Sequence, residues 1–78
     1  MTKGLTDMGA ESISLTVNGK AESLDAAMDV HAFLQKKKMN PDAVVVELNR
    51  EILDKNNYEN TLLAQGDSIE ILQFVGGG

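Results

Sequence analysis

The chain contains no cysteine, and this absence removes several classes of chemistry. Without thiols it has no disulfide framework, no thiolate metal site, no iron–sulfur cluster and no cysteine nucleophile. Histidine is almost as scarce, because His31 is the single one. A metal site needs several ligands, so no metal centre is expected and His31 is interpreted as a solvated residue near a helix start.

Aromatic residues are also few: there is no tryptophan, one tyrosine and two phenylalanines among 78 residues. The core must therefore be aliphatic, and a chain of this length forms one small domain. A body of this size encloses a catalytic pocket with difficulty. Composition favours a binding module, a carrier or a subunit, with no catalytic residues of its own.

No apolar run approaches the roughly 20 residues of a membrane span, and no signal-peptide core is present at the N-terminus. We therefore expect a cytoplasmic protein with no membrane partner. The net charge is -5, from twelve acidic and seven basic residues. Nucleic acid is an unsuitable partner for such a surface, whereas a basic patch on another protein would complement it.

Hydrophobic periodicity predicts a hairpin near the start of the fold. Residues Ser12–Val17 alternate between polar and apolar, as in a half-buried strand. Asn18-Gly19 is typical of a type I′ turn, and Lys20–Leu24 is expected to return as the second strand. Residues 1–11 show no sustained period and are predicted to be a flexible extension, with the natural start possible near Met8.

A helix is predicted next, with Asp29 as its N-cap. Its apolar stripe consists of Val30, Phe33 and Leu34. Lysines 36–38 are placed in the last turn, where cations favour the helix dipole, and are interpreted as a solvated helix end. Pro41 stops the helix.

The second half of the chain is rich in strand signals. The predicted strands are Ala43–Leu48, the short Glu51–Leu53 and the final strand Ser68–Val75. Between the last two, Asp54–Asn60 is a polar segment and Thr61–Leu63 is a single helical turn or a covering loop. A tight turn follows, in which Gly66 adopts the positive φ that glycine allows. The order ββαβ(β)β predicts an α+β roll. In it, one helix covers one face of a mixed four- to five-stranded sheet whose last strand is central.

The apolar final strand runs directly into Gly76-Gly77-Gly78. Glycine holds extended structure poorly and adds nothing to a core, so these residues suit a thin thread that carries a terminal carboxylate. Fully extended, the last four residues would reach roughly 13 Å from the folded body. The alternative is an ordinary frayed end.

Three stretches resemble the ThiS family of sulfur carrier proteins of thiamine biosynthesis. They are Val45–Ile52 (VVELNREI), Gly66–Ile71 (GDSIEI) and Phe74–Gly78 (FVGGG). The resemblance implies a β-grasp (ubiquitin-like) domain over residues 12–75, followed by a flexible reactive tail, 76–78. The chain departs from the common family pattern at Leu53-Asp54-Lys55 and at Tyr58, which affects the partner surface and not the tail.

The resemblance also implies a mechanism. A ThiF-type (E1-like) enzyme would adenylate the carboxylate of Gly78, a persulfide donor would supply sulfur, and the resulting thiocarboxylate would pass sulfur to thiazole synthase. Gly76 and Gly77 would thread into the partner. ATP and magnesium would belong to the activating enzyme, since the chain has no phosphate-binding loop and no tightly bound cofactor is expected.

On the final strand, Ile69 and Ile71 are predicted to face inward and Leu72 and Phe74 to form a docking patch for the partners. The alternative is that Leu72 and Phe74 pack beneath Thr61–Leu63.

Other functions fit the same pattern. They are the small subunit of molybdopterin synthase, a cysteine-biosynthesis sulfur carrier, a ubiquitin-like modifier and a non-reactive β-grasp interaction domain. A β-grasp ferredoxin is excluded by the missing cysteines.

Overall fold

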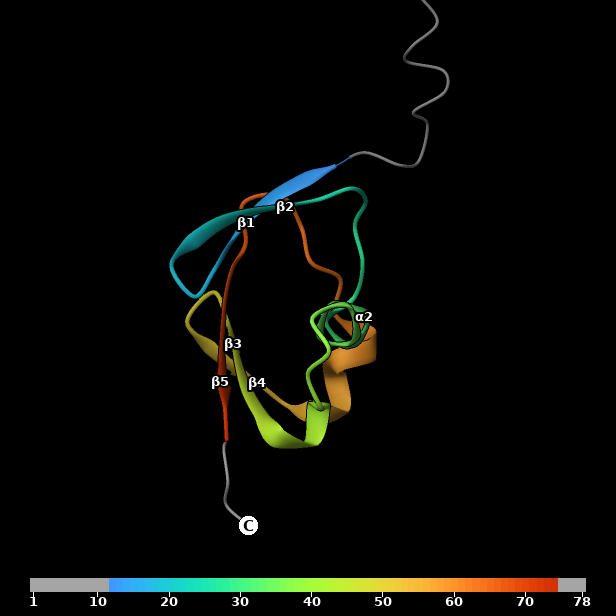
Figure 1. Cartoon of the computed structure of the whole chain (residues 1–78), viewed down its shortest axis with the longest axis vertical. Coiled ribbons are helices and arrows are strands. Elements are labelled where there is room, and N and C mark those ends of the chain that lie inside the picture. The colour runs from blue at the N-terminus through green and yellow to red at the C-terminus, as the bar shows by residue number, and fades with distance from the viewer. Residues whose placement is uncertain (1–11, 75–78) are drawn as a thin grey trace, which may run out of the picture.

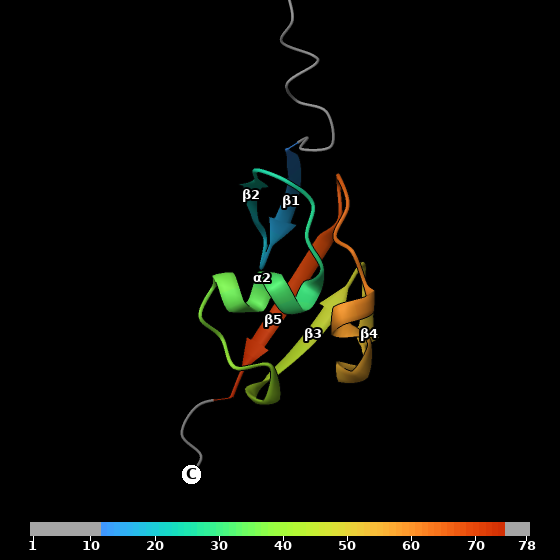
Figure 2. The same cartoon turned by 90° about the vertical axis from the view of Figure 1, so that its right-hand side faces the viewer.

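The computed structural model describes residues 12–74, which form a five-stranded mixed sheet with one helix across one face (Figures 1 and 2). The elements are β1 (Ile13–Val17), β2 (Lys20–Leu24), α2 (Val30–Lys36), the short 3₁₀ helix η1 (Pro41–Ala43), β3 (Val44–Leu48), β4 (Glu51–Leu53), the 3₁₀ helix η2 (Lys55–Asn60) and β5 (Ser68–Gln73). The strand order is β2-β1-β5-β3-β4, with β1 and β5 parallel and the other pairs antiparallel. The predicted α+β roll, with the last strand central, is confirmed.

The hairpin of β1 and β2 closes at the predicted turn. Asn18 and Gly19 have φ values of +50° and +85°, as a type I′ turn requires, and Val17 pairs with Lys20 across it. Gly66 also has a φ of +85°, which confirms its predicted place in a turn.

A second tight turn joins β3 to β4 at Asn49-Arg50, where the φ values are +52° and +73°. Leu48 pairs with Glu51 across this turn. Asn49-Arg50 separates the strands predicted at Ala43–Leu48 and Glu51–Leu53, but arginine does not signal positive φ, so no tight turn was predicted there. The twist of the two strands imposes this backbone nevertheless.

Helix α2 begins at its predicted cap, where an Asp29 carboxylate oxygen accepts a hydrogen bond from the Ala32 N–H at 2.7 Å. The helix ends at Lys36, earlier than predicted. Lys38 adopts a left-handed φ of +61°, and the Met39 N–H donates to the Leu34 carbonyl at 2.9 Å. The placement of all three lysines in the last turn is therefore wrong, since a Schellman-type cap ends the helix first.

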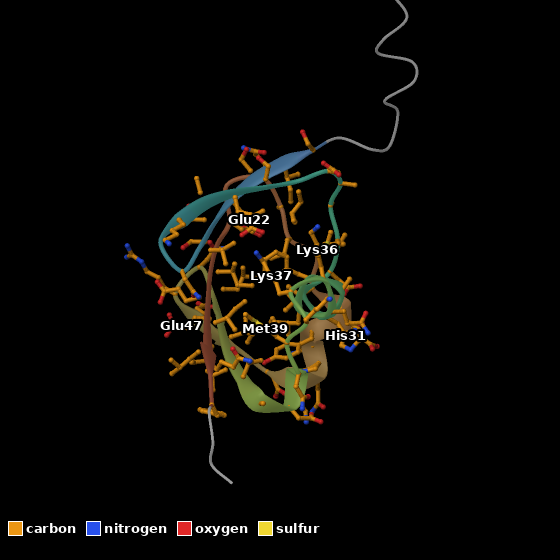
Figure 3. The ribbon with its side chains drawn as sticks, in the orientation of Figure 1. Glu22, His31, Lys36, Lys37, Met39 and Glu47 are labelled. Atoms are coloured by element: carbon orange, nitrogen blue, oxygen red, sulfur yellow. The ribbon has the colours of Figure 1, made fainter. Side chains whose placement is uncertain are left out.

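Lys37 is not a solvated helix end either. Its ammonium group lies 2.6 Å from a Glu22 carboxylate oxygen and 5.5 Å from the centre of the Phe33 ring. Figure 3 shows Lys37 and Glu22 in the space between α2 and the hairpin. The pair joins the helix end to strand β2, an approach that sequence spacing did not reveal.

The core lies between the sheet and α2. Its buried members are Leu15, Leu24, Val30, Phe33, Leu34, Val44, Val46, Tyr58, Leu63, Ile69 and Ile71. Ten of these eleven side chains are aliphatic or phenylalanine, as the scarcity of aromatic residues predicted. Phe33, Val30 and Leu34 are fully buried, so the predicted stripe of the helix is confirmed.

Thr61–Leu63 is a covering loop, and the alternative of a helical turn there is wrong. The Val30 N–H donates to the Thr61 carbonyl and the Leu63 N–H to the Met28 carbonyl, both at 2.9 Å. The helical turn lies in the preceding segment of the chain, η2, where the Asp54 side chain accepts a hydrogen bond from the Asn56 N–H. The polar composition of that segment had indicated only a turn.

Within residues 12–74, no helix is long and apolar enough to cross a membrane. The predicted extension 1–11, Val75 and the tail 76–78 lie outside the described residues.

Candidate functional site

Strand β5 is the element that leads to the tail, and it lies between β1 and β3. Ile69 and Ile71 are buried, which confirms their predicted inward orientation. The strand ends at Gln73, two residues before the predicted end. Phe74 still donates its N–H to the Ala43 carbonyl at 2.9 Å, so the contact with the β3 side continues past the strand. The base from which the tail departs is therefore anchored on its β3 side up to Phe74.

The asparagines of the two tight turns both bind β5. Asn49 accepts from the Ser68 N–H at 2.9 Å through its side-chain oxygen, at the start of the strand. Asn18 accepts from the Ile71 N–H at 2.7 Å and donates to the Ile71 carbonyl at 3.4 Å. The pairing of β1 with β5 ends at Val17 and Ile69. The Asn18 side-chain amide therefore makes the hydrogen bonds to Ile71 that a further residue of β1 would otherwise make.

Leu72 lies on the sheet face opposite α2, because it follows the buried Ile71 in the alternation of β5. Phe74 follows two residues later, and the exposed fractions of Leu72 and Phe74 are 65% and 60%. The alternative that they pack beneath the covering loop is wrong, because Leu63 of that loop is buried in the core on the other face. Their role as a docking patch stays a prediction. Gly76, Gly77 and Gly78, with their predicted roles, lie outside the described residues.

The structure adds Val45 and Ile52 to this face and places the acids Glu47 and Glu70 beside them. On β3, Val45 pairs with Leu72 and Glu47 pairs with Glu70. On β4, Ile52 pairs with Glu47 and is 67% exposed. The signal was available in the alternation of β3, since an inward Val44 and Val46 require an outward Val45 and Glu47. We call these residues the outer patch: Val45, Glu47, Ile52, Glu70, Leu72 and Phe74.

The outer patch contains a shallow hollow of about 330 Å³. It is lined by Asn18, Val45, Glu47, Glu70, Ile71 and Leu72. Figure 3 shows Glu47 on the side of the sheet away from α2. The hollow therefore combines two carboxylates with apolar walls, directly beside the strand that leads to the tail.

A second hollow, of about 380 Å³, lies on the helix side and includes His31, Tyr58 and Glu59 in its lining. The His31 Nδ1 atom lies 3.9 Å from a Glu59 carboxylate oxygen. Burial raises the pKa of the Tyr58 hydroxyl above its usual value. Among residues 12–74, no group of three or more His, Asp or Glu side chains is arranged to hold a metal ion.

An exposed ion pair borders the second hollow. The Lys55 ammonium group lies 2.6 Å from an Asp42 carboxylate oxygen. This hydrogen bond, together with the charge of Lys55, lowers the pKa of the Asp42 carboxyl, and the pKa of Lys55 is raised in return. The pair joins η1 to η2 at the surface.

The profile of the ThiS family matches residues 10–78. The chain is similar to the sulfur carrier protein ThiS of Bacillus subtilis, with 39% identity over 49 residues that cover 63% of this chain and 74% of that protein. It is also similar to the crystal structure of the thiamine biosynthesis protein ThiS from Geobacter metallireducens. That match has a TM-score of 0.74 and 38% identity, and it covers 85% of this chain and all of the other.

A longer protein matches as well. The thiazole synthase of Paramagnetospirillum magneticum is 36% identical over 66 residues, which cover 85% of this chain. The matched region is 20% of that protein, so this chain spans about one fifth of the length of its thiazole synthase relative.

Proposed function

The chain belongs to the ThiS family of sulfur carriers in thiamine biosynthesis, and from this premise we propose that its cargo is bound at the carboxylate of Gly78. The observation that supports this most directly is the match of the family profile through Gly78. The anchoring of β5 by β3 and by the two turn asparagines adds a physical reason. A reactive group on a thread is useful only if the base of that thread is fixed.

The chemistry begins with a nucleophile that is ionised at neutral pH, since a terminal carboxyl has a pKa of about 3.3–3.7. In the active site of a ThiF-type enzyme, a carboxylate oxygen of Gly78 attacks the α-phosphorus of ATP and pyrophosphate leaves. The terminal sulfur of a persulfide then displaces AMP, and a thiol cleaves the resulting acyl disulfide to release the thiocarboxylate. ATP and magnesium are bound by the enzyme.

Gly76 and Gly77 serve in this scheme as a backbone without side chains. A channel that fits bare backbone excludes any Cβ and allows the carboxylate to approach ATP closely. Leu72 and Phe74 dock the folded domain while the tail is inside the channel. Two exposed apolar side chains beside a tail of this kind are suitable anchors for a protein interface.

Thiazole synthase is the proposed acceptor of the sulfur. A thiazole synthase is 36% identical to this chain over most of the chain's length, so a domain of this type and thiazole synthase occur together in one polypeptide. Covalent fusion of this kind is consistent with two proteins that meet in the same reaction sequence. No observation favours the molybdopterin branch or a non-reactive interaction domain.

Intact-mass measurement tests the proposal. The protein is incubated with ATP, magnesium, a ThiF-type enzyme and a persulfide donor, and the expected product gains the mass difference between one sulfur and one oxygen at Gly78. Adding thiazole synthase and its substrates should return the mass to the starting value. An unchanged mass in the first step, with an enzyme that activates another ThiS protein, would contradict the proposal.

A further inference from the structure

Two glutamates face each other on the outer patch. Glu47 of β3 and Glu70 of β5 are direct partners across antiparallel strands. Glu47 lies on the face away from α2 (Figure 3), and Glu70 shares that face because it alternates with the buried Ile69 and Ile71. Like charges in directly opposed positions destabilise a sheet. An unfavourable pair in the centre of a small sheet calls for a reason other than stability.

Within residues 12–74, neither glutamate has a cationic partner, although other acids of the chain do. Glu22 pairs with Lys37 and Asp42 with Lys55, whereas no nitrogen of a described basic side chain lies within 4 Å of Glu47 or Glu70. The described surface therefore leaves two adjacent negative charges uncompensated at the base of the tail.

The surroundings of the pair are shaped to receive an elongated cation. The hollow of about 330 Å³ places the two carboxylates beside the side chains of Val45 and Leu72. An arginine side chain has an aliphatic stem and a planar head with five N–H donors, so its stem can contact the apolar wall while its head donates to both carboxylates. A single ammonium group matches this arrangement less well.

We propose that the Glu47–Glu70 pair binds an arginine side chain of the activating enzyme, and that this contact contributes to the affinity for that enzyme. The inference rests on the proposed function, because it takes the ThiF-type enzyme as the occupant. That enzyme has to bring an anionic carboxylate against the anionic phosphates of ATP. Cationic side chains along the path of the tail would favour this step, and the outer patch lies on the strand that leads to the tail.

Stability and binding should respond in opposite directions if the pair exists for binding. Glu47→Gln or Glu70→Gln relieves the repulsion, so the free protein should be as stable as the wild type or slightly more stable. The same substitutions remove one charge-assisted contact with the arginine. The dissociation constant for the enzyme should rise about 10- to 100-fold.

The experiment measures the dissociation constant by titration calorimetry, the steady-state constants of thiocarboxylate formation and the thermal midpoint, all on the full chain. We expect Glu47→Gln and Glu70→Gln to raise KM with little change in kcat. The double variant should lose less than the product of the single losses, because both carboxylates bind one head. Glu59→Gln, which makes the same change of charge on the helix side, is the control and should bind like the wild type.

Two results would overturn the inference. One is that Glu47→Gln and Glu70→Gln bind the enzyme as the control does. The other is that their loss of affinity is accompanied by an equal loss of stability, which would indicate a structural role. A wild-type chain that binds the enzyme but forms no thiocarboxylate would contradict the proposed function instead, and the binding comparison would still decide the role of the pair.

Discussion

The side-chain amide of Asn18 binds both main-chain groups of Ile71, accepting from its N–H at 2.7 Å and donating to its carbonyl at 3.4 Å. Asn18→Gly keeps the left-handed turn but removes both bonds. We expect a loss of about 1–2 kcal/mol in the free energy of unfolding. Amide hydrogen exchange of Ile71 should become faster.

Asn18→Asp provides the matched comparison, because aspartate also tolerates positive φ and keeps the acceptor for the Ile71 N–H. Exchange at Ile71 should stay slower than in Asn18→Gly, although the added negative charge beside Glu47 and Glu70 offsets part of the stability that the retained bond gives. Equal exchange of Ile71 in all three proteins would show that the amide does not support β5.

Lys38 occupies the left-handed position after α2, with a φ of +61°. Glycine is preferred there because it has no Cβ to strain the backbone. Lys38→Gly should therefore stabilise the protein by about 0.5–1 kcal/mol, measured by urea denaturation. Lys38→Ala removes the same charge and keeps the strain. A similar gain in both variants would assign the effect to charge.

Gly77→Ala places a Cβ in the proposed thread, and deletion of Gly78 removes the reacting carboxylate from its normal position. Both changes should abolish thiocarboxylate formation, followed by intact mass, and both should leave the circular dichroism spectrum and the thermal midpoint unchanged. Normal activation of either variant would contradict the proposed threading.

Leu72→Ala and Phe74→Ala test the docking role of the exposed apolar residues. Since both side chains are mostly in solvent, each change should alter stability by no more than about 0.5 kcal/mol. Each should weaken binding of the activating enzyme by about 10-fold or more. Leu62, exposed to the same degree on another surface, offers a matched control, and Leu62→Ala should bind normally. If Leu72→Ala and Phe74→Ala bound the activating enzyme as well as Leu62→Ala does, the proposed docking role would be contradicted.

The exposed pair of Asp42 and Lys55 predicts a measurable pKa difference. Lys55 lowers the pKa of the Asp42 carboxyl, so the pair favours the folded state above the ordinary aspartate pKa and loses this effect as pH falls through the lowered value. In Lys55→Met, the pKa of Asp42 should rise toward its ordinary value in an NMR titration. An unchanged pKa would show that the contact does not persist in solution.

Most of the fold could be predicted because local signals agreed with each other. Asn18-Gly19 fixed the first turn, Asp29 the helix start, and the periodicity of Val30, Phe33 and Leu34 the buried face of α2. The elements that were misjudged depend on distant parts of the chain. The contact of Lys37 with Glu22, for example, forms only once the hairpin is folded beside the helix.

The candidate site was predicted in part for a similar reason. Leu72 and Phe74 could be assigned to the outer face from the alternation of a single strand. The opposition of Glu47 and Glu70 depends on the register between β3 and β5, which no residue spacing specifies. Ile52 required, in addition, the recognition of a tight turn at Asn49-Arg50.

The parallel pairing of β1 with β5 has a consequence for the order of folding. Thr16 aligns with Ser68, so the centre of the sheet joins parts of the chain that are about fifty residues apart. During synthesis, β1–β4 and α2 therefore emerge from the ribosome before the strand that completes their core. A chain that ends before Ser68 lacks the core residues Ile69 and Ile71. Because its core is incomplete, it should be degraded by proteases before a partner binds it.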